Sequence, residues 1–448
     1  MVARRARATG ALTACLVLGA VRAAGASPFD VFGFGPSGVA SVGARAARAC
    51  DGTASFYNPG GLALGEGYHL ELGVLGAVSA LTAQGERQRI SDPVGLTIAL
   101  DGDIPLEGPL EGVLRAGYGG YALSDSLMHL ETPARIDPTF PYYANRTQRL
   151  VVLPALAARV TRWLGVGVAA NAFASLGGPV ALSKGASGAL EARIDEEATT
   201  TLGVIVGAQA SPTDYLRFGL VYREEFAVPI RTRSFSTVGS MPLLVDVSLG
   251  QAFFTPEEYV LAIAVMPAPP LELELDAAYE RWGEYRGPSM RTRATLPGVA
   301  LDPRRVPALF RDVWTLRAAA TYRFALGRHE LALDAGAGYE PSVLRAEQQG
   351  ETNLVDGRKV SFGAGVELIL RQLLGERALH FGAGAQVQAV GSYFQAKQVC
   401  RTSGACAPDE VWGEDALTPD AGIANPGYPA LSGSGRVWAL TGAVGVDL

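Results

Sequence analysis

The sequence predicts an all-β fold, a 14-stranded antiparallel transmembrane β-barrel whose lumen is plugged by an N-terminal hatch. Three observations support this: long stretches alternate between apolar and polar residues, short and long connectors take turns, and a Gly- and Ala-rich segment precedes the first such stretch. Glycine accounts for 55 of 448 residues and charged residues for only 18%. Beyond the N-terminal signal, no apolar run approaches the roughly 20 residues of a membrane-spanning helix. If the chain crosses a membrane, it must do so with strands.

Residues 1–26 predict a secretory signal peptide. Arg4, Arg5 and Arg7 precede an apolar run, and small residues at 24–26 suit cleavage before Ser27. The sequence LTAC at 12–15 is similar to a lipoprotein processing box, but little apolar sequence precedes it, so lipidation is the weaker alternative. Cleavage removes four arginines and no acids, which changes the formal charge from -6 to -10. Such an acidic chain is poorly suited to bind nucleic acid.

Residues 27–66 predict the hatch, and residues 67–448 predict the barrel around it. The hatch contains Pro59, whose φ is fixed, next to Gly60, which could adopt a positive φ, so the chain can reverse sharply there. The sequence GFGPSG at 33–38 also matches the dinucleotide-binding pattern GxGxxG. No strand precedes it and no amphipathic helix follows it, so flexible hatch backbone is the better interpretation.

The alternation of residues separates two faces along each predicted strand. In LELELDAAYE, leucines occupy positions 271, 273 and 275, and acidic residues occupy positions 272, 274 and 276. The strands of a soluble sandwich also alternate, but such strands are typically about 5 or 6 residues long. These stretches run to about ten residues or more and often end in aromatic residues, as in outer-membrane barrels.

Connector lengths support the same architecture, because such barrels have short periplasmic turns and long external loops. Short turns are expected near 162–164, 212–214, 268–270 and 327–328, and long connectors near 125–146, 227–258, 285–311, 341–358 and 396–432. The fourteen predicted strands are 67–82, 93–103, 112–124, 147–161, 164–177, 188–211, 215–226, 258–267, 271–284, 312–325, 329–340, 359–371, 378–395 and 433–448. The last strand ends at Leu448, whereas barrel-assembly signals usually end in Phe.

The stretch FGFGPSGVASVGARAARACDGTASFYNPGGLAL resembles the N-terminal hatch of the FadL/TodX family of outer-membrane transporters. The family pattern is a Gly-rich start, a small-residue segment with an acidic residue, and Asn-Pro-x-x-Leu. The residues matched are Gly38, Gly43, Asp51, Asn58, Pro59 and Leu62, with Gly60 following Pro59. SPTDYLRFGLVYREEF, LELELDAAYERWGEY and RDVWTLRAAATYRF resemble strand-turn-strand segments of the same family.

The resemblance implies passive uptake of hydrophobic compounds, such as long-chain fatty acids or aromatic hydrocarbons. The solute would be captured at external loops, held in an interior pocket and passed through a hatch-gated lumen, with lateral exit through the wall. The implied partners are these solutes and outer-membrane lipid, and we expect a monomer in the bacterial outer membrane. The alternative is a general porin or structural barrel without solute preference. A hatch of some 35 residues would obstruct the open aqueous path that a porin needs.

Two groups of residues are candidates for ligand binding. The connector GSMPLLVDVSLGQAFF at 239–254 is unusually apolar, and exposed apolar patches often mark binding sites, although it could instead be barrel wall or loop packing. Arginines on inward faces could bind a carboxylate through a bidentate fork, or could pair with Glu272, Glu274, Asp276 and Glu367. The candidates are Met241, Leu243, Leu244, Phe253 and Phe254 in the connector, and Arg217, Arg223, Arg317 and Arg323 in the strands, with Met128, Phe140, Tyr142 and Tyr143 as secondary candidates.

Other chemistry has little support in the sequence. Cys400 and Cys406 are expected to form a disulfide in an external loop, metal binding being the weaker option, and Cys50 is expected to stay unpaired. The four histidines show no paired metal-ligand spacing, and there is no HExxH or GxSxG motif. We therefore expect no enzyme activity, cofactor or metal, although a lipase-type barrel could assemble Ser and His from distant strands.

Overall fold

The chain is represented by a computed structural model. The residues that it describes are 27–88, 90, 92–126, 137–143, 147, 149–177, 180–184, 190–194, 197–238, 241–285, 287, 290–296, 299–301, 310–345, 353–374, 377–396, 399–400, 411–412 and 430–448. The predicted signal peptide, residues 1–26, lies outside them.

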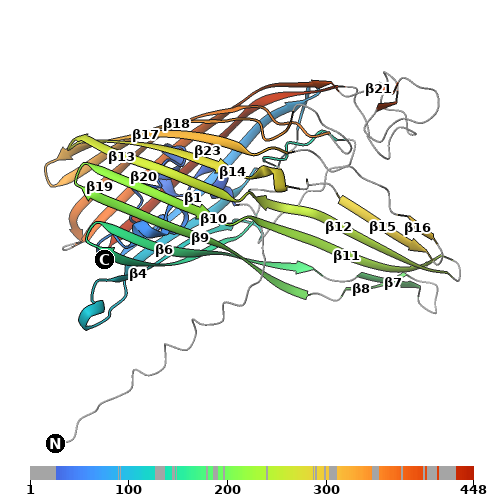
Figure 1. The fold of residues 1–448 in the computed structure, drawn as a ribbon, viewed down its shortest axis with the longest axis horizontal. Coiled ribbons are helices and arrows are strands. Elements are labelled where there is room, and N and C mark those ends of the chain that lie inside the picture. Colours follow the sequence, from blue (N-terminus) through green and yellow to red (C-terminus); the bar gives the residue numbers. More distant parts are fainter. Residues whose placement is uncertain are drawn as a thin grey trace, which may run out of the picture.

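Fourteen antiparallel strands form a closed barrel, as the sequence predicts (Figure 1). The barrel closes because β1 pairs with β3 on one side and with β23 on the other. The strands are β1 (His69–Ala83), β3 (Val94–Asp103), β4 (Leu114–Leu123), β5 (Val151–Thr161), β6 (Leu164–Gly177), β9 (Glu197–Thr213), β10 (Leu216–Arg223), β13 (Glu258–Ala268), β14 (Leu271–Glu280), β17 (Val313–Leu326), β18 (His329–Glu340), β19 (Lys359–Leu374), β20 (Arg377–Ala396) and β23 (Ala430–Asp447).

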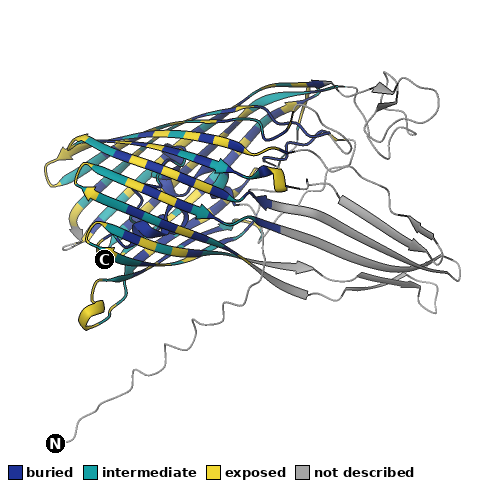
Figure 2. Cartoon of the chain, in the orientation of Figure 1, coloured by how far each residue is buried: buried dark blue, intermediate teal, exposed yellow. Residues whose placement is uncertain are grey.

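The two faces of each barrel strand meet different surroundings (Figure 2). On β14, Leu273 and Leu275 are 38% and 52% exposed, whereas Glu274 and Asp276 are 3% and 1% exposed. Apolar side chains therefore point outward and polar ones inward, the reverse of a soluble protein and the arrangement of a barrel in lipid. Other exposed apolar residues that follow this pattern are Phe218, Leu220, Trp314, Leu316, Tyr322, Phe324, Phe362 and Val366.

The short turns gather at one end of the barrel, which we call the periplasmic end. The turns after β5, β9, β13 and β17 lie there. Three of them lie where predicted, and the turn predicted at 212–214 lies slightly later, between Thr213 and Leu216. The C-terminus lies at the same end, where the Leu448 amide donates a 2.8 Å hydrogen bond to the Tyr68 carbonyl. The long connectors leave the opposite, external end. None of the helices in the described part of the chain is long and apolar enough to cross a membrane.

The connectors expected at 227–258 and 285–311 contain strands that the sequence analysis did not predict. β11 (Phe226–Val238) and β12 (Met241–Thr255) form a long hairpin, and β15 (Met290–Leu296) and β16 (Val299–Leu301) extend its sheet. Their pairing satisfies backbone N–H and C=O groups within the sheet. This six-stranded sheet, completed by β7 (Val180–Lys184) and β8 (Leu190–Ile194), extends beyond the external end (Figure 1).

The smaller elements lie in the connectors. Part of the strand predicted at 188–211 belongs to this outer sheet as β8, and the barrel strand begins later, at Glu197. The remaining elements are β2 (Glu86–Arg87), β21 (Val399–Cys400), β22 (Val411–Trp412) and the 3-10 turns η1 (Gly108–Leu110) and η2 (Trp282–Glu284).

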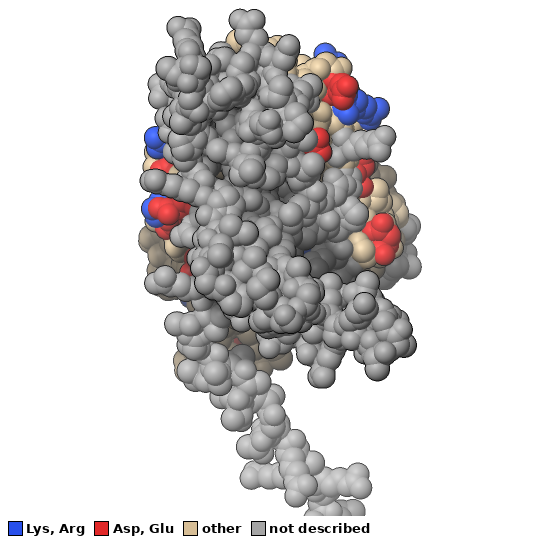
Figure 3. Space-filling model, turned by 90° about the vertical axis from the view of Figure 1, so that its right-hand side faces the viewer, with Lys and Arg blue, Asp and Glu red and all other residues tan. Residues whose placement is uncertain are grey.

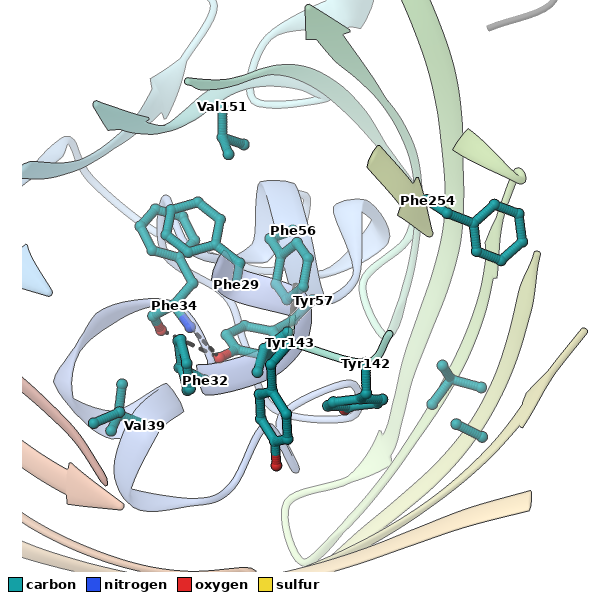
Figure 4. Close-up of a cluster of buried hydrophobic side chains, with 14 of the residues drawn as sticks. Phe29, Phe32, Phe34, Val39, Phe56, Tyr57, Tyr142, Tyr143, Val151 and Phe254 are labelled. Atoms are coloured by element: carbon teal, nitrogen blue, oxygen red, sulfur yellow. Dashed lines mark hydrogen bonds between the residues drawn. The ribbon is translucent and has the colours of Figure 1, made fainter. Parts of the chain in front are cut away.

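The N-terminal segment, residues 27–66, consists of short helical turns: α1 (Pro28–Phe32), α2 (Gly35–Ala40), α3 (Ala54–Tyr57) and α4 (Pro59–Leu62). Ser27 caps α1 in a capping box with Asp30, and Asn58 caps α4 by accepting a 3.1 Å hydrogen bond from the Gly60 amide. Pro59 occupies the first position of α4, where its missing N–H costs nothing. Strands surround these turns, whose aromatic side chains pack together (Figure 4).

Close contact between this segment and the inner wall explains many of the wall glycines. A Cβ atom at Gly219 on β10 would lie 2.2 Å from the Ala46 carbonyl oxygen, and one at Gly384 on β20 would lie 2.4 Å from that of Pro36. Similar approaches occur at Gly119, Gly165, Gly167, Gly207, Gly336 and Gly363. At Gly119 on β4 the contact is with the side chains of Ser55 and Phe34. The other glycines lie on β6, β9, β10, β18, β19 and β20, so backbone of residues 27–66 meets the wall on widely separated strands.

Candidate functional site

An aromatic cluster lies at the external mouth of the barrel. Phe254, at the end of β12, stacks on Tyr285 at 4.4 Å between ring centroids, and Trp282 lies 5.6 Å from Phe254. Phe310 lies 4.6 Å from Tyr285. Tyr142 comes from a different connector, and its ring lies 5.9 Å from that of Trp282. All five side chains are buried, so they already pack against one another.

Residues 139–143, which we call the lid, are held over the barrel interior by main-chain bonds. The Thr139 amide donates to the Asn353 carbonyl at 2.7 Å, and the Thr139 carbonyl accepts from the Val355 amide at 2.8 Å. These two bonds pair the lid with the connector between β18 and β19 in a short parallel bridge.

Side chains fix the lid further. The Tyr142 hydroxyl donates to Glu340 at 2.7 Å, and the Lys359 ammonium lies 4.1 Å from the centre of the Tyr142 ring. Lys359 also bonds to Asp356 at 2.9 Å and lies 3.4 Å from Glu340. Burial raises the pKa of the connector residue Asp356, and the Lys359 charge opposes this effect. The lid is thus clamped by a buried cation shared between two carboxylates and an aromatic ring.

A cavity of about 60 Å³ lies between the lid and the N-terminal segment. At roughly 10–15 Å³ for each water, it has room for only a few water molecules. Aromatic rings border it on both sides, with Phe29, Phe56 and Tyr57 from the segment and Tyr142 from the lid. Its wall is polar, with Arg223, Glu258, Glu280, Arg317, Glu340, Gln386 and Gln388 among the lining residues.

Two of the four predicted arginines border this cavity and share one carboxylate. Arg223 pairs with Glu258 and donates to the carbonyls of Phe56 at 3.0 Å and Tyr57 at 3.3 Å, so it holds the N-terminal segment. Arg317 lies 3.6 Å from both Glu258 and Glu280, longer than a hydrogen bond. Because its ion-pair contacts are long, Arg317 is better placed than Arg223 to turn toward a ligand.

The other two arginines lie at the periplasmic end, away from Arg223 and Arg317. Arg217 bonds to Glu272 at 3.1 Å and Arg323 to Glu330 at 2.7 Å. Both line a cavity of about 380 Å³ beneath the N-terminal segment. The other acidic partners expected from the sequence bind elsewhere: Glu274 pairs with Arg48, Asp276 accepts from the Ala46 amide, and Glu367 pairs with His380.

Residues predicted for the hatch lie where the segment packs most tightly. A Cβ atom at Gly38 would lie 2.0 Å from the Tyr57 hydroxyl oxygen, so only glycine fits. That hydroxyl accepts a 2.7 Å hydrogen bond from the Phe34 amide, and burial raises the pKa of Tyr57 to about 12. Gly43 has a φ of 81°, which favours glycine. Leu62 is fully buried.

Asp51 organises the turn before α3. Burial alone would raise the pKa of the Asp51 carboxyl, but Arg45 at 3.3 Å and hydrogen bonds from Thr53 outweigh burial and hold this pKa below its usual range. Asp51 therefore stays ionised and keeps the Thr53 amide and hydroxyl in place.

The Asn-Pro-Gly sequence binds the wall through Asn58. Its side-chain amide donates to the carbonyls of Ala46 at 2.7 Å and Ala208 at 3.0 Å. Gly60, which the sequence suggested could adopt a positive φ, is not among the positive-φ glycines of the described residues. A Cβ there would lie 2.8 Å from backbone atoms of Gly165, Gly207 and Ala208, so glycine is required for close approach.

Several predicted residues cannot be placed in a site. Phe254 joins the mouth cluster, but the side chains of Met241, Leu243, Leu244 and Phe253 lie outside the described part of the structure. Met128, Cys406 and the predicted disulfide with Cys400 lie outside it as well. Among the described residues, no group of three or more His, Cys, Asp or Glu could hold a metal ion.

Sequence reasoning missed the residues that hold the lid. Lys359, Glu340 and Gln388 lie on inward positions of three strands, and Trp282 follows β14. The alternation on β20 could have identified Gln388 as facing inward, but no sequence signal pairs it with a tyrosine 245 residues away.

In the view onto the external end, described acidic and basic side chains both appear near the periphery (Figure 3).

Comparison with known proteins identifies relatives of the fold. A scan against protein-family models and a search of curated proteins found no match. Among solved structures, a Pseudomonas aeruginosa FadL homologue matches with a TM-score of 0.58 and 12% identity, over 92% of this chain and 97% of that one. The Ralstonia pickettii toluene transporter TbuX matches with a TM-score of 0.52 and 17% identity, over 93% of this chain and 99% of that one.

The toluene transporter TodX of P. putida matches with a TM-score of 0.54 and 14% identity, over 94% of this chain and 99% of that one. These identities are low, and the agreement concerns the path of the backbone over nearly the full length of each chain. The chain is therefore a closed 14-stranded β-barrel of the outer-membrane type, with the fold of a FadL homologue and of the toluene transporters TbuX and TodX.

Proposed function

We propose that this protein lets small hydrophobic compounds cross the bacterial outer membrane passively, and that residues 27–66 act as the hatch that closes its lumen. One observation carries the proposal: backbone of these residues meets wall glycines on six strands, and the cavity left under the lid is only about 60 Å³. A general porin needs an open aqueous path. A lumen filled in this way is better suited to a transporter that binds its solute and then transfers it than to an open pore.

The aromatic surroundings favour a hydrophobic solute. Rings from the N-terminal segment and from the lid border the same cavity, and aromatic side chains provide much apolar contact area. The neighbouring structures TbuX and TodX are described as toluene transporters, and CymD, with 16% identity and a TM-score of 0.53, as a monoaromatic hydrocarbon channel. An aromatic hydrocarbon is therefore our first candidate.

A fatty acid is the second candidate, and Arg317 is the residue that favours it. Its guanidinium borders the cavity, and its two carboxylate contacts are 3.6 Å long. A fatty-acid carboxylate could compete for such a cation with a bidentate pair of hydrogen bonds. In either case the small cavity means that the lid, the hatch or both must move before a solute of this size can bind.

Uptake by vesicles that contain the purified protein tests the proposal. Radiolabelled toluene, oleate and the hydrophilic sugar arabinose should be compared in vesicles with the protein and in empty vesicles. We expect the protein to accelerate transfer of toluene or oleate and to leave arabinose transfer unchanged. Equal acceleration of arabinose would contradict the proposal and favour a porin. Native mass spectrometry of the purified protein would identify any solute that remains bound.

A further inference from the structure

One buried side chain joins the lid to the N-terminal segment. Gln388, on the inner face of β20, is 4% exposed. Its Oε1 accepts a 2.9 Å hydrogen bond from the Tyr143 hydroxyl, and its Nε2 donates a 2.6 Å hydrogen bond to the Val31 carbonyl. Tyr143 belongs to the lid and Val31 to α1, so two separate parts of the closed lumen depend on one amide.

The chemistry of the partners fixes the orientation of that amide. A main-chain carbonyl can only accept, so the NH₂ group of Gln388 must face Val31. Its oxygen then faces Tyr143, whose hydroxyl can donate. Both bonds are satisfied in this one orientation. If the amide rotates to follow a displaced Tyr143, it weakens its bond to Val31.

The same residue borders the cavity that a solute would occupy. Gln388, Val31 and Tyr142 all line the space between the lid and the segment. A solute that enters beneath the lid must displace Tyr142 or its neighbour Tyr143. The bond from Tyr143 to Gln388 lies on the lid side of this space, and the bond from Gln388 to Val31 lies on the hatch side.

We propose that Gln388 is a positioning residue that couples displacement of the lid to release of α1, so that the external and internal closures of the lumen open together. This inference rests on the proposed function only for its physiological purpose, since the coupling itself exists without a solute. Coupling between two sites is reciprocal. Loosening α1 must therefore also loosen the lid.

The contrast between the two lid tyrosines gives a matched control. Tyr143→Phe removes the hydroxyl that bonds to Gln388, and Tyr142→Phe removes the neighbouring hydroxyl, which bonds to Glu340. Both changes delete one oxygen atom from the lid and keep the ring. Only the first interrupts the link to α1. Gln388→Met has a similar length and shape but can make neither hydrogen bond.

Amide hydrogen exchange of residues 29–33 in the lipid-embedded full-length protein tests the coupling. A typical hydrogen bond contributes about 0.5–1.5 kcal/mol, so its loss changes an opening equilibrium roughly two- to tenfold. We expect Tyr143→Phe to speed exchange in residues 29–33 roughly two- to tenfold and Tyr142→Phe, which loosens the lid but keeps the link through Gln388, to have a smaller effect. We expect Tyr143→Phe to have no further effect in a Gln388→Met background.

The two substitutions, Tyr143→Phe and Gln388→Met, form a double-mutant cycle, and each of its outcomes is decisive. Unchanged exchange in Tyr143→Phe would overturn the proposal, and so would an equal effect of Tyr143→Phe with and without Gln388→Met. An equal effect of Tyr142→Phe would mean that the lid acts through general packing, which also overturns it. Uptake separates this inference from the transport function: a non-additive cycle without uptake of either toluene or oleate would keep the coupling and remove the proposed function.

Discussion

The side-chain amide of Asn58 donates a 3.0 Å hydrogen bond to the main-chain carbonyl of Ala208 on β9, 150 residues later in the sequence. Asn58 is fully buried, and its two other hydrogen bonds hold the Ala46 carbonyl and the Gly60 amide. One residue thus caps α4, ties α4 to the rest of the N-terminal segment and attaches the segment to the wall. The Asn-Pro-Gly sequence is an anchoring point as well as a bend.

Asn58→Ala should loosen the N-terminal segment and leave the barrel folded. The change removes three hydrogen bonds and leaves two buried carbonyls without this donor, which should cost about 2–4 kcal/mol in the local stability of the segment. Faster hydrogen exchange of residues 54–65 would show this effect. Asn58→Asp keeps the acceptor for Gly60 but turns a carboxylate oxygen toward the Ala46 and Ala208 carbonyls, so it should loosen the segment at least as much as Asn58→Ala. Equal exchange in the wild type and in Asn58→Ala would contradict the anchoring role.

Gly60→Ala should displace α4 from the wall. The added Cβ would lie 2.8 Å from backbone atoms of two strands, and a barrel wall cannot move as a flexible side chain can. Gly442→Ala on β23 is the control, because the nearest atom to its Cβ lies 3.8 Å away. We expect roughly 1–3 kcal/mol of local destabilisation at Gly60, read as protease cleavage within residues 54–65, and none at Gly442. Similar cleavage of both variants would refute the close approach.

Lys359→Met should detach the lid. Lys359 is buried, and its removal leaves Asp356 and Glu340 without their shared cation and Tyr142 without its cation contact. Breaking a buried ion pair by removing one partner typically costs about 3–5 kcal/mol. We expect new protease cleavage within residues 139–143. Lys359→Arg keeps the charge and should remain resistant. A resistant Lys359→Met protein would show that the main-chain bonds of Thr139 suffice to hold the lid.

Cys50 should react slowly with thiol reagents at neutral pH, because burial raises the pKa of its thiol to about 11. At pH 8 only about one such thiol in a thousand is ionised, compared with about a quarter of exposed thiols. Alkylation should be roughly 250-fold slower than that of an exposed cysteine and should rise about tenfold per pH unit up to pH 10. The background from other cysteines is measured in Cys50→Ser. Fast, pH-independent labelling would show that the site is open in solution.

The barrel could be predicted from the sequence because its signal is local. Each strand carries its own two-residue period, and each short turn its own length, so Leu273, Leu275 and Asp276 identify their faces without knowledge of any partner. β11 and β12 were assigned to a connector instead, because they lie outside the regular series of barrel strands and short turns. Their backbone hydrogen bonds pair β11 with β12 and β12 with β15, and composition does not reveal such pairing.

The candidate site could be predicted only in part, because its contacts join residues far apart in the sequence. Asn58 and Pro59 could be identified by resemblance, yet their partners at Ala208 and Gly207 could not. Arg223 was predicted as a possible ligand contact, and the structure places it on the carbonyls of Phe56 and Tyr57. The alternation of residues along a strand shows which side chains point inward. The partner of each inward side chain depends on the register of the whole barrel.

Single-channel recording in planar lipid bilayers tests most directly the central claim, that the lumen is closed by the N-terminal segment and the lid. A variant without residues 28–62 serves as the control, and recovery of its folded barrel must be verified by heat-modifiable gel mobility. We predict no large, steady ion current through the wild-type protein and a large current through the deletion variant. A large, steady current through the wild type would contradict the account and favour an open porin.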